Sequence, residues 1–426
     1  MQDTSVSERR PGTLAAFASR DFRLLWGGQA ISFVGDAAFL VGLGWRVTAL
    51  TGKASSLGYV LALQSGAMLV TLLLGGVLAD RYPRRLLLIS SDLARAAVVG
   101  VFLAIELSGH MRLAWILVLA ACFGLADGFF QPAFLGIAPL LVEGPALASA
   151  NSLLSVARQA SSIAGPALAA GLYGWLGPTP VWGLDTGSFL VSAAALWVAR
   201  PRRIVSETRA GFGRELAEGF RYVSSVPWIW TGILAATVIL MLAVAPFNTL
   251  LPRIVQAHYH RGVGSYGLLF SLMAVGMVAG SLTWARWNPS RSRVLICFVA
   301  FGINDLGIVA VGLSPWYALA AAAVVWRGFW IGLSISAWTT LLTELVPERL
   351  LSRVFSFDFF GSLGLMPVGY VLAATVATAI APTTILAVGG AVAAALWFVP
   401  LSWPRVRAAA DTRALPSSVS YSCDRQ

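Results

Sequence analysis

Long apolar segments separated by short polar turns recur along the whole chain. A helix of roughly 20 residues spans the ~30 Å hydrocarbon core of a bilayer, where every backbone polar group must be hydrogen-bonded within the protein. The composition agrees, because 58% of the residues are hydrophobic and only 12% are charged. We therefore expect an integral membrane protein whose spans cover residues 23-48, 56-79, 86-107, 113-134, 149-173, 181-199, 228-252, 264-285, 293-313, 316-343, 353-376 and 383-400.

The longest polar interruption, residues 200-227, leaves six predicted spans on either side. Similar residues recur in the two halves at one constant separation along the chain: Gly280 corresponds to Gly76, and Leu345 corresponds to Leu141. Repeated halves of this kind are typical of secondary transporters. The sequence predicts an all-α membrane protein of twelve transmembrane helices in two six-helix bundles. Its parts are an N-terminal bundle with a short leader at 1-199, a linker at 200-227, a C-terminal bundle at 228-400 and a tail at 401-426.

Apolar residues recur every three or four positions in the linker, at Phe212, Leu216, Phe220 and Val223, and charged residues occupy the other side. This pattern predicts an amphipathic helix on the inner surface of the membrane. The alternative is a docking helix for a regulatory partner.

The net charge of +11 is spread over many turns rather than gathered in one domain, which argues against nucleic-acid binding. Positive residues accumulate on the cytoplasmic side of membrane proteins. With both termini inside, most arginines fall in cytoplasmic segments, and the external turns hold Lys53, Arg112, Arg253 and Arg261. We expect a multi-pass protein of the cell membrane, surrounded by lipid, with both termini cytoplasmic and without an obligate protein partner.

A charged turn connects the second and third predicted spans and contains Gly76, Asp80, Arg81, Arg84 and Arg85. Asp80 lies at the C-terminal end of a helix, where the helix dipole disfavours an anion unless a cation or another helix N-terminus compensates it. An ordinary positive-inside loop explains the arginines but not the aspartate. The turn is therefore a candidate functional motif.

Carboxylates inside the hydrocarbon cost several kcal/mol unless they are paired or hydrated. A rise of 1.5 Å per residue places Asp127 and Arg158 at similar depths, and it places both Asp305 and Arg327 near the midplane. We predict that each of these two pairs is structural.

Asp36 is the leading candidate for proton coupling, and Asp127 is the second. Asp36 lies about 20 Å along the first span, with no basic residue at a comparable depth nearby in the sequence. Desolvation favours the neutral form of a carboxylate, so Asp36 can take up and release a proton during a transport cycle. The alternative is a carboxylate that is hydrogen-bonded to neighbouring helices for structure.

The remaining intramembrane carboxylates need no functional explanation. Asp92 and Arg95 are one helical turn apart and are expected to pair. Asp358 is expected in the first two turns of the eleventh span, where the helix dipole favours an anion, and Asp185 near the outer end of the sixth.

Other chemistry is sparse. The chain has no phosphate-binding glycine loop with its lysine, and Lys53 is its single lysine. His258 and His260 alternate in an external turn without an acidic or cysteine partner, so we expect polar loop residues rather than a metal site. Because no nucleophile, base and orienting group occur together, we expect neither an enzyme nor a cofactor nor a bound metal.

Several segments resemble the major facilitator superfamily, and within it the drug-efflux branch that includes macrolide efflux proteins and the enterobactin exporter. The similarity extends over about residues 19-400. The segments that carry it are Phe129-Phe130-Gln131-Pro132-Ala133, Ala150-Asn151-Ser152-Leu153, Leu251-Pro252, Val346-Pro347-Glu348 and Arg353-Val354.

The resemblance implies roles for two of the motifs. The charged turn is similar to a loop that latches the two bundles together on the cytoplasmic side, although Pro83 replaces the usual glycine. The segment around Gly165 and Pro166 is similar to an antiporter signature in which alanines replace some glycines, and the alternative is a proline-kinked packing helix. The fourth span lacks the arginine that many antiporters carry, so a proton route through such a residue is not implied.

In this superfamily the first, fourth, seventh and tenth spans line a central cavity. The resemblance therefore places candidate substrate contacts at Gln131, Asn248, Trp326, Arg327 and Trp330. The two tryptophans lie one turn apart and deep in their span, where they can stack on an aromatic substrate or pack against a neighbouring helix.

The sequence and the resemblance together predict a secondary active transporter. It is expected to export a hydrophobic or amphipathic small molecule, such as a drug, an antibiotic, a siderophore or another natural product, in exchange for protons. The alternatives are an importer or facilitator of the same fold and a flippase for lipids such as lysophospholipids.

Overall fold

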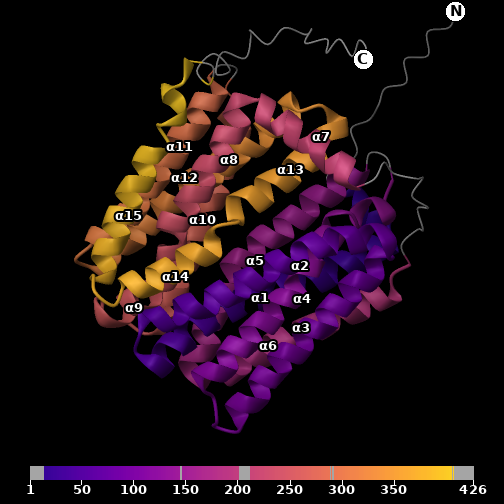
Figure 1. Ribbon diagram of the computed structural model, residues 1–426. Coiled ribbons are helices and arrows are strands. Elements are labelled where there is room, and N and C mark those ends of the chain that lie inside the picture. Colours follow the sequence, from indigo (N-terminus) through magenta and orange to yellow (C-terminus); the bar gives the residue numbers. More distant parts are fainter. Residues whose placement is uncertain are drawn as a thin grey trace, which may run out of the picture.

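The computed structural model describes residues 14-143, 146-200, 212-287, 289, 292-404 and 406, and the account below concerns these residues alone. Helices account for nearly all of the described chain, and no strand occurs in it. The helices form two groups, coloured indigo to magenta and rose to yellow in Figure 1. We call α1 to α6 the first bundle and α8 to α15 the second bundle.

The first bundle contains six long helices, which the short turns of the sequence separate. Their bounds are α1 Arg20–Thr51, α2 Ala54–Arg81, α3 Arg84–Leu107, α4 Leu113–Leu135, α5 Ala146–Leu176 and α6 Thr179–Val198. Two single turns of 3-10 helix, η1 Ala15–Ala18 and η2 Ala138–Leu140, complete this half.

The second bundle begins after α7 Phe212–Ser225. Its helices are α8 Pro227–Ile239, α9 Ala245–Ala257, α10 Val263–Trp287, α11 Arg293–Leu313, α12 Tyr317–Leu345, α13 Glu348–Leu363, α14 Met366–Val376 and α15 Pro382–Leu396, followed by the turn η4 Pro400–Ser402.

Eleven helical segments of the described chain are long and apolar enough to cross a membrane. The one predicted span without a counterpart among the eleven is the fifth, 149-173. It coincides with α5 Ala146–Leu176, which is 31 residues long. Polar residues such as Ser155, Arg158 and Gln159 explain this difference, because they lower the hydropathy of the helix. The helical fold is therefore confirmed, and α5 is a helix of sufficient length whose surface is partly polar.

Two spans of the second bundle are interrupted where proline removes a backbone donor. The seventh span passes from α8 to α9 through five residues of π-helix, Leu240–Val244, next to Pro246. The eleventh span starts earlier than predicted, at Glu348, and breaks between α13 and α14 at Gly364 and Leu365, next to Pro367. A π-turn or a break of this kind allows a helix to bend at that point.

The closest helix contacts repeat in the two bundles. In the first bundle, a Cβ added to Gly124 on α4 would lie 2.0 Å from the carbonyl oxygen of Gln64 on α2. In the second, a Cβ added to Gly332 on α12 would lie 2.0 Å from the carbonyl oxygen of Met277 on α10. Glycine lets helix backbones approach this closely. The packing of α4 against α2 in the first bundle therefore resembles the packing of α12 against α10 in the second.

The two bundles meet near one end of the molecule, on the side opposite α7 (Figure 1). On α10, Ser271 donates a hydrogen bond of 2.8 Å to the carbonyl of Ile163 on α5. A Cβ added to Gly267 would lie 2.5 Å from the carbonyl oxygen of Pro166. On α2, a Cβ added to Gly58 would lie 2.6 Å from the carbonyl oxygen of Tyr370 on α14. We call this region the seam.

Helix α7 occupies the linker and packs against α13 and α8 at the other end, which we call the α7 end. Phe220 lies beside Phe357 of α13 with ring centroids 6.0 Å apart. The Tyr222 hydroxyl donates to the carbonyl of Leu345 at 3.4 Å, and Glu218 forms an ion pair with Arg353. The linker helix is thus attached to the second bundle.

Candidate functional site

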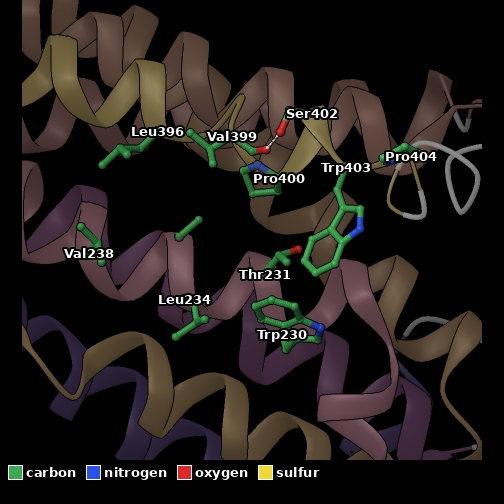
Figure 2. A pocket seen from close by; sticks show the side chains of 11 residues that line it. Trp230, Thr231, Leu234, Val238, Leu396, Val399, Pro400, Ser402, Trp403 and Pro404 are labelled. Carbon is green, nitrogen blue, oxygen red and sulfur yellow. Dashed lines mark hydrogen bonds between the residues drawn. The ribbon is translucent and has the colours of Figure 1, made fainter.

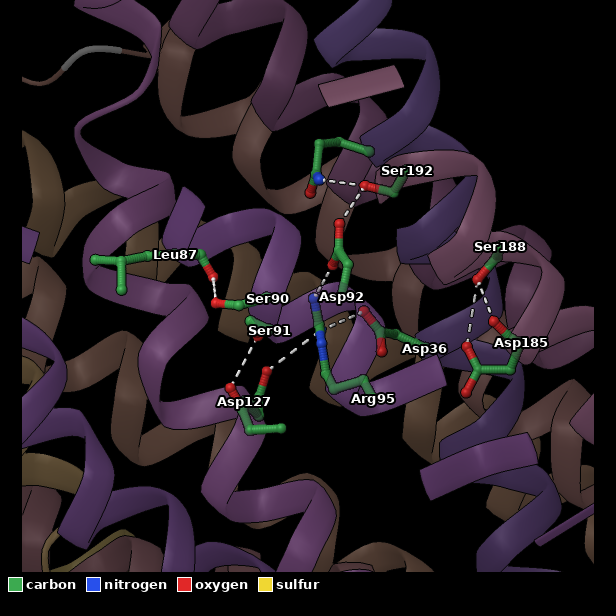
Figure 3. A network of polar contacts seen from close by, with 12 residues as sticks. Asp36, Leu87, Ser90, Ser91, Asp92, Arg95, Asp127, Asp185, Ser188 and Ser192 are labelled. Carbon is green, nitrogen blue, oxygen red and sulfur yellow. Dashed lines mark hydrogen bonds and ion pairs between the residues drawn. The ribbon is translucent and has the colours of Figure 1, made fainter. Parts of the chain in front are cut away.

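A cluster of four charged side chains lies inside the first bundle, with Arg95 of α3 at its centre (Figure 3). Its Nη2 is 2.6 Å from Oδ1 of Asp92 on the same helix. Its Nη1 is 3.5 Å from Oδ2 of Asp36 on α1 and 3.4 Å from Oδ1 of Asp127 on α4. Three carboxylates from three helices therefore converge on one guanidinium.

The Asp92 side of the cluster is completely enclosed. Asp92 and Arg95 have exposed side-chain fractions of 0% and 1%. The second carboxylate oxygen of Asp92 accepts a 2.6 Å hydrogen bond from Ser192 on α6, whose hydroxyl accepts one of 2.7 Å from Gln29 on α1. Because both of its oxygens have close partners, Asp92 holds Arg95 in place.

Two aromatic rings lie close to the guanidinium of Arg95. The Arg95 Cζ lies 4.3 Å from the ring centroid of Phe130 on α4 and 4.4 Å from that of Phe189 on α6. Cations are attracted to the faces of aromatic rings, most strongly where water is excluded. These rings add contacts from two helices, α4 and α6, to the ion pairs of Arg95.

Asp36 and Asp127 form the open side of the cluster. Their side chains are 31% and 21% exposed, unlike the enclosed Asp92 and Arg95. Their contacts with Arg95 are longer than the 2.7–2.9 Å typical of a charge-assisted hydrogen bond. Asp36 and Asp127 are therefore both accessible and only loosely paired, so either carboxylate can accept a proton that reaches this bundle.

The structure changes two expectations about these residues. Asp36 does have a basic neighbour, Arg95, which comes from α3 rather than from a nearby stretch of the sequence. Asp127 makes its direct contact with Arg95, so the predicted pair of Asp127 and Arg158 is present only as an attraction at longer range. The guanidinium of Arg158 instead lies over Phe33 and Phe134, at 5.0 Å and 5.5 Å from their ring centroids. The predicted pair of Asp92 and Arg95 is confirmed.

Asp185 lies in the second turn of α6, close to the end of the span where the sequence placed it. It is completely buried on α6, and its Oδ1 accepts a 3.4 Å hydrogen bond from Ser188. Its Oδ2 has no hydrogen-bond partner. A Cβ added to Gly35 of α1 would lie 2.6 Å from Oδ1, so this carboxylate is packed beside the helix that carries Asp36.

The second bundle holds its intramembrane charges apart. Asp305 accepts hydrogen bonds from Trp397 at 2.9 Å and Asn304 at 3.0 Å. Arg327 lies 4.5 Å from the ring centroid of Phe247 and donates to Sδ of Met273 at 2.9 Å. Asp305 and Arg327 therefore form no direct ion pair: their close partners are neutral, and the predicted pairing is present only as an attraction at longer range.

Asp358 also differs from its prediction. It lies ten residues beyond the start of α13 at Glu348, well past the first two turns, where the helix dipole no longer stabilises an anion. Its Oδ2 accepts a 3.0 Å hydrogen bond from the indole of Trp338 on α12. Asp358 is therefore satisfied by a neighbouring helix rather than by its own N-terminus.

The candidate substrate contacts differ in their exposure and in their partners. Trp326 is 51% exposed and packs edge-to-face against the half-buried Trp330, whereas Arg327 is only 2% exposed. Asn248 of α9 donates a 3.4 Å hydrogen bond to the hydroxyl of Tyr370 on α14. Gln131 of α4 is half-buried.

The described arginines of the charged turn bind within their own bundle. Arg84 donates to the carbonyl of Gly136 after α4 at 2.6 Å, and Arg85 donates to the carbonyl of Leu196 near the end of α6 at 2.7 Å. Cations are favoured at the C-terminal ends of helices, where carbonyls are unpaired. The side chains of Asp80 and Arg81, and the surroundings of Gly76, lie outside the described residues.

Gly165 and Pro166 lie where α5 passes between the two bundles. A Cβ added to Gly165 would be 2.5 Å from Cβ of Ala37 on α1, while Pro166 contributes its carbonyl to the seam at Gly267. This segment therefore packs against α1 on one side and against the second bundle on the other.

The two histidines do not form a metal site with their described neighbours. Nε2 of His258 lies 3.1 Å from the carbonyl oxygen of Ser314, and no group of three potential ligands occurs in the described chain. Between them, Tyr259 donates to the carbonyl of Val311 at 3.2 Å, and burial raises the pKa of its hydroxyl to about 12.

An apolar groove of about 570 Å³ opens between α8 and the end of α15 (Figure 2). Trp230 and Trp403 stand at its edge with ring centroids 5.5 Å apart. The groove contains no charged side chain, so it offers shape but no group for proton exchange. Its lining residues are Trp230, Thr231, Leu234, Ala235, Val238, Leu396, Val399, Pro400, Ser402, Trp403 and Pro404.

Residues 25–365 match the family model described as Major Facilitator Superfamily. The chain is 23% identical over 369 residues to macrolide efflux protein A of Streptococcus pyogenes, covering 83% of this chain and 88% of that protein. It is 26% identical over 340 residues to the enterobactin exporter of Citrobacter koseri, covering 78% and 79%. These matches confirm the resemblance inferred from the motifs.

Solved structures share the fold at low sequence identity. A bacterial homologue of the human lysosomal transporter Spinster, inward-facing and unoccupied, has a TM-score of 0.69 and 14% identity, with 92% of this chain and 97% of that chain covered. A bacterial homologue of the iron transporter ferroportin, also inward-facing, has a TM-score of 0.68 and 14% identity, with 90% and 99% covered.

Proposed function

Because this chain belongs to the Major Facilitator Superfamily, we propose that it exports hydrophobic or amphipathic small molecules in exchange for protons. Membership of the family makes the chain a transporter rather than an enzyme. The observation that carries the proton half of the proposal is the cluster in Figure 3, where Asp36 and Asp127 are partly exposed inside a membrane-spanning bundle. Intramembrane carboxylates of this kind mark ion pathways.

The direction and the cargo rest on the relatives. One is named for macrolide efflux and another for enterobactin export, so both names describe small molecules leaving the cell. We therefore propose that this chain exports a drug, an antibiotic, a siderophore or another natural product. Export of a macrolide would confer antibiotic resistance.

The seam suggests which side is open. With both termini and α7 in the cytoplasm, as the charge distribution favours, the seam lies toward the outside. The two bundles then separate toward the cytoplasm, and the cargo enters from that side. Alternating access requires the seam to open and the α7 end to close.

The charged turn and the α5 segment are the parts that would move. Arg84 and Arg85 bind carbonyls of their own bundle here, and we propose that the turn at Gly76–Arg85 latches onto the second bundle when the α7 end closes. Gly165 and Pro166 form the part of α5 on which the seam opens. Gln131, Asn248, Trp326 and Trp330 remain the proposed substrate contacts, whereas Arg327 is enclosed by Met273 and Phe247.

Uptake into everted membrane vesicles tests this function. Ethidium and erythromycin serve as probes, a pH gradient is imposed with ATP synthase inhibited, and wild type is compared with Asp36→Asn. We expect gradient-dependent uptake by wild type and its loss in Asp36→Asn, because asparagine cannot take up a proton. The matched control is Asp358→Asn, an intramembrane aspartate of the second bundle that is bound by Trp338.

Each other result has a defined meaning. Equal uptake by wild type and Asp36→Asn would make Asp36 a structural residue. Transfer of labelled lysophospholipid without uptake of either probe would replace the proposal with a flippase. Accumulation in the opposite direction would make the chain an importer.

A further inference from the structure

Arg95, like its enclosed partner Asp92, is held firmly within the cluster. Its Nη2 is bound to Asp92 at 2.6 Å, and its Cζ lies 4.3 Å and 4.4 Å from the ring centroids of Phe130 and Phe189. Asp92 in turn is bound to Ser192 at 2.6 Å. One end of the guanidinium is therefore anchored to α3 and α6. Nε has no hydrogen-bond partner among the described residues, and Nη1 is the nitrogen that faces the other two carboxylates.

That remaining nitrogen is shared almost equally. Asp36 and Asp127 lie 3.5 Å and 3.4 Å from Nη1, so neither has a close ion pair. Asp127 approaches from α4 and Asp36 from α1, on different sides of Arg95 (Figure 3). Loss of charge on one carboxylate would leave Nη1 free to bind the other at a normal hydrogen-bond distance.

The charges that face the cluster can be counted helix by helix. Asp36 on α1, Asp92 on α3 and Asp127 on α4 are negative, and Arg95 on α3 is positive. Arg158 on α5 lies within electrostatic range of Asp36 and Asp127 and adds a second positive charge.

Asp185 on α6 is the remaining titratable group beside the cluster. It is completely buried with an unpartnered oxygen, so we count it as uncharged, because an unpaired buried carboxylate is very costly. Three negative and two positive charges then leave an excess of one negative charge. One proton neutralises it.

We propose that Arg95 is the positioning residue of proton coupling: anchored by Asp92, it shares Nη1 between Asp36 and Asp127, which together carry one proton per transport cycle. The inference rests on the proposed function, because it assigns the parts of the same exchange. The arginine that the fourth span lacks is supplied here by α3, the neighbouring helix.

The two carboxylates stand on helices that reach the other bundle by different routes. Asp36 is on α1, which touches the second bundle where Trp45 and Tyr266 lie 6.0 Å apart. Asp127 is on α4, which packs against α2, and α2 contacts α14. A change of partner at Nη1 therefore changes the forces on α1 and on α4, and each of these helices is connected to the seam by a different set of contacts.

The experiment measures accumulation at equilibrium in everted vesicles, with the membrane potential clamped by potassium and valinomycin. The probe is whichever of ethidium and erythromycin the wild type accumulates. One exchanged proton lets a gradient of one pH unit support about a tenfold accumulation, since each unit is worth about 1.36 kcal/mol. We expect about tenfold accumulation in wild type and none in Arg95→Gln, with probe counterflow at equal pH retained in both.

Two variants separate positioning from a structural role. Arg95→Lys keeps the charge count, so we expect the same accumulation ratio at a lower rate and with a displaced pH profile. Arg46→Gln is the matched control, because Arg46 and Glu106 form a 2.7 Å pair between the same two helices, α1 and α3, nearer the seam end. Its ratio and pH profile should equal those of wild type.

Poor folding of Arg95→Gln would not end the test. The double variant Asp92→Asn/Arg95→Gln removes both members of the buried pair, which avoids an uncompensated charge, and it also lacks the shared nitrogen. It should show counterflow without accumulation.

Two results would overturn the inference alone. The first is gradient-driven accumulation that is equal in wild type and in Arg95→Gln or the double variant. The second is a wild-type accumulation ratio near a hundredfold per pH unit, which would indicate about two protons. A wild type that shows no gradient-driven accumulation would overturn the proposed function itself, and the inference with it.

Discussion

The two bundles differ in the partners of most of their intramembrane aspartates. In the first bundle, Asp36, Asp92 and Asp127 gather around a single arginine. In the second, Asp305 and Asp358 each accept a hydrogen bond from a tryptophan indole, Trp397 and Trp338. A proton that binds in the first bundle changes which residues attract one another, whereas the neutral donors of the second bundle only hold a carboxylate in place.

The bundles also differ in where their helices are interrupted. Helices α1 and α5 run for 32 and 31 residues without a break. Their counterparts in the second bundle, the seventh and eleventh spans, contain the π-helical segment Leu240–Val244 and the break at Gly364. The first bundle is thus built to hold charge in a fixed frame, and the second is built to bend.

The largest effect on stability is expected from Asp92→Asn. This change leaves Arg95 buried without its close ionic partner, and breaking one side of a buried ion pair costs about 3–5 kcal/mol. Thermal unfolding of the purified protein, followed by tryptophan fluorescence, should show a large fall in the midpoint. If Asp92→Asn lost no more stability than Asp305→Asn, the two bundles would not differ in how strongly their aspartates stabilise the fold.

An intermediate effect is expected where the bundles are alike. Gly124→Ala and Gly332→Ala each place a methyl group 2.0 Å from a carbonyl oxygen of the neighbouring helix. Overpacking of this kind costs about 1–3 kcal/mol, so both variants should unfold at lower temperature by similar amounts. Gly183→Ala is the control, because a Cβ there meets nothing within 4 Å. Strongly unequal losses would contradict the repeated packing of the two halves.

The smallest effect is expected from Asp305→Asn. The asparagine keeps an oxygen that can accept the hydrogen bond from Trp397, so we expect a loss of about 1 kcal/mol or less. The same unfolding measurement checks this value. A loss as large as that of Asp92→Asn would show that Asp305 has an ionic role, which would most directly implicate Arg327.

Hydropathy predicted the helices well because a lipid environment demands long, internally hydrogen-bonded segments. The ends of the predicted spans agree with α3, α4 and α11 to within a few residues. The breaks near Pro246 and Pro367 were not predicted, since proline inside a membrane helix is compatible with a straight, kinked or interrupted course.

Ion pairs were harder to predict, because depth along a helix does not say which helices are neighbours. Counting 1.5 Å per residue puts Asp127 about 12 Å from the end of α4 and Arg95 about 17 Å from the start of α3, so their heights are compatible. The same count also allowed Arg158. The packing of α3 against both α4 and α6 decides between them, and that packing is a property of the whole bundle.

The seam joins the bundles through dipoles rather than ions. Its described contacts are a serine hydroxyl on a carbonyl, glycines against the carbonyls of Pro166 and Tyr370, and the ring of Tyr266 beside Trp45. Dissolved salt screens full charges far more than it affects such contacts. Ionic strength should therefore leave the opening of the seam almost untouched and act chiefly at the α7 end, where the proposed latch of the turn with Arg84 and Arg85 would form between the bundles. Salt thus becomes a means of slowing or speeding one gate of the transporter without disturbing the other.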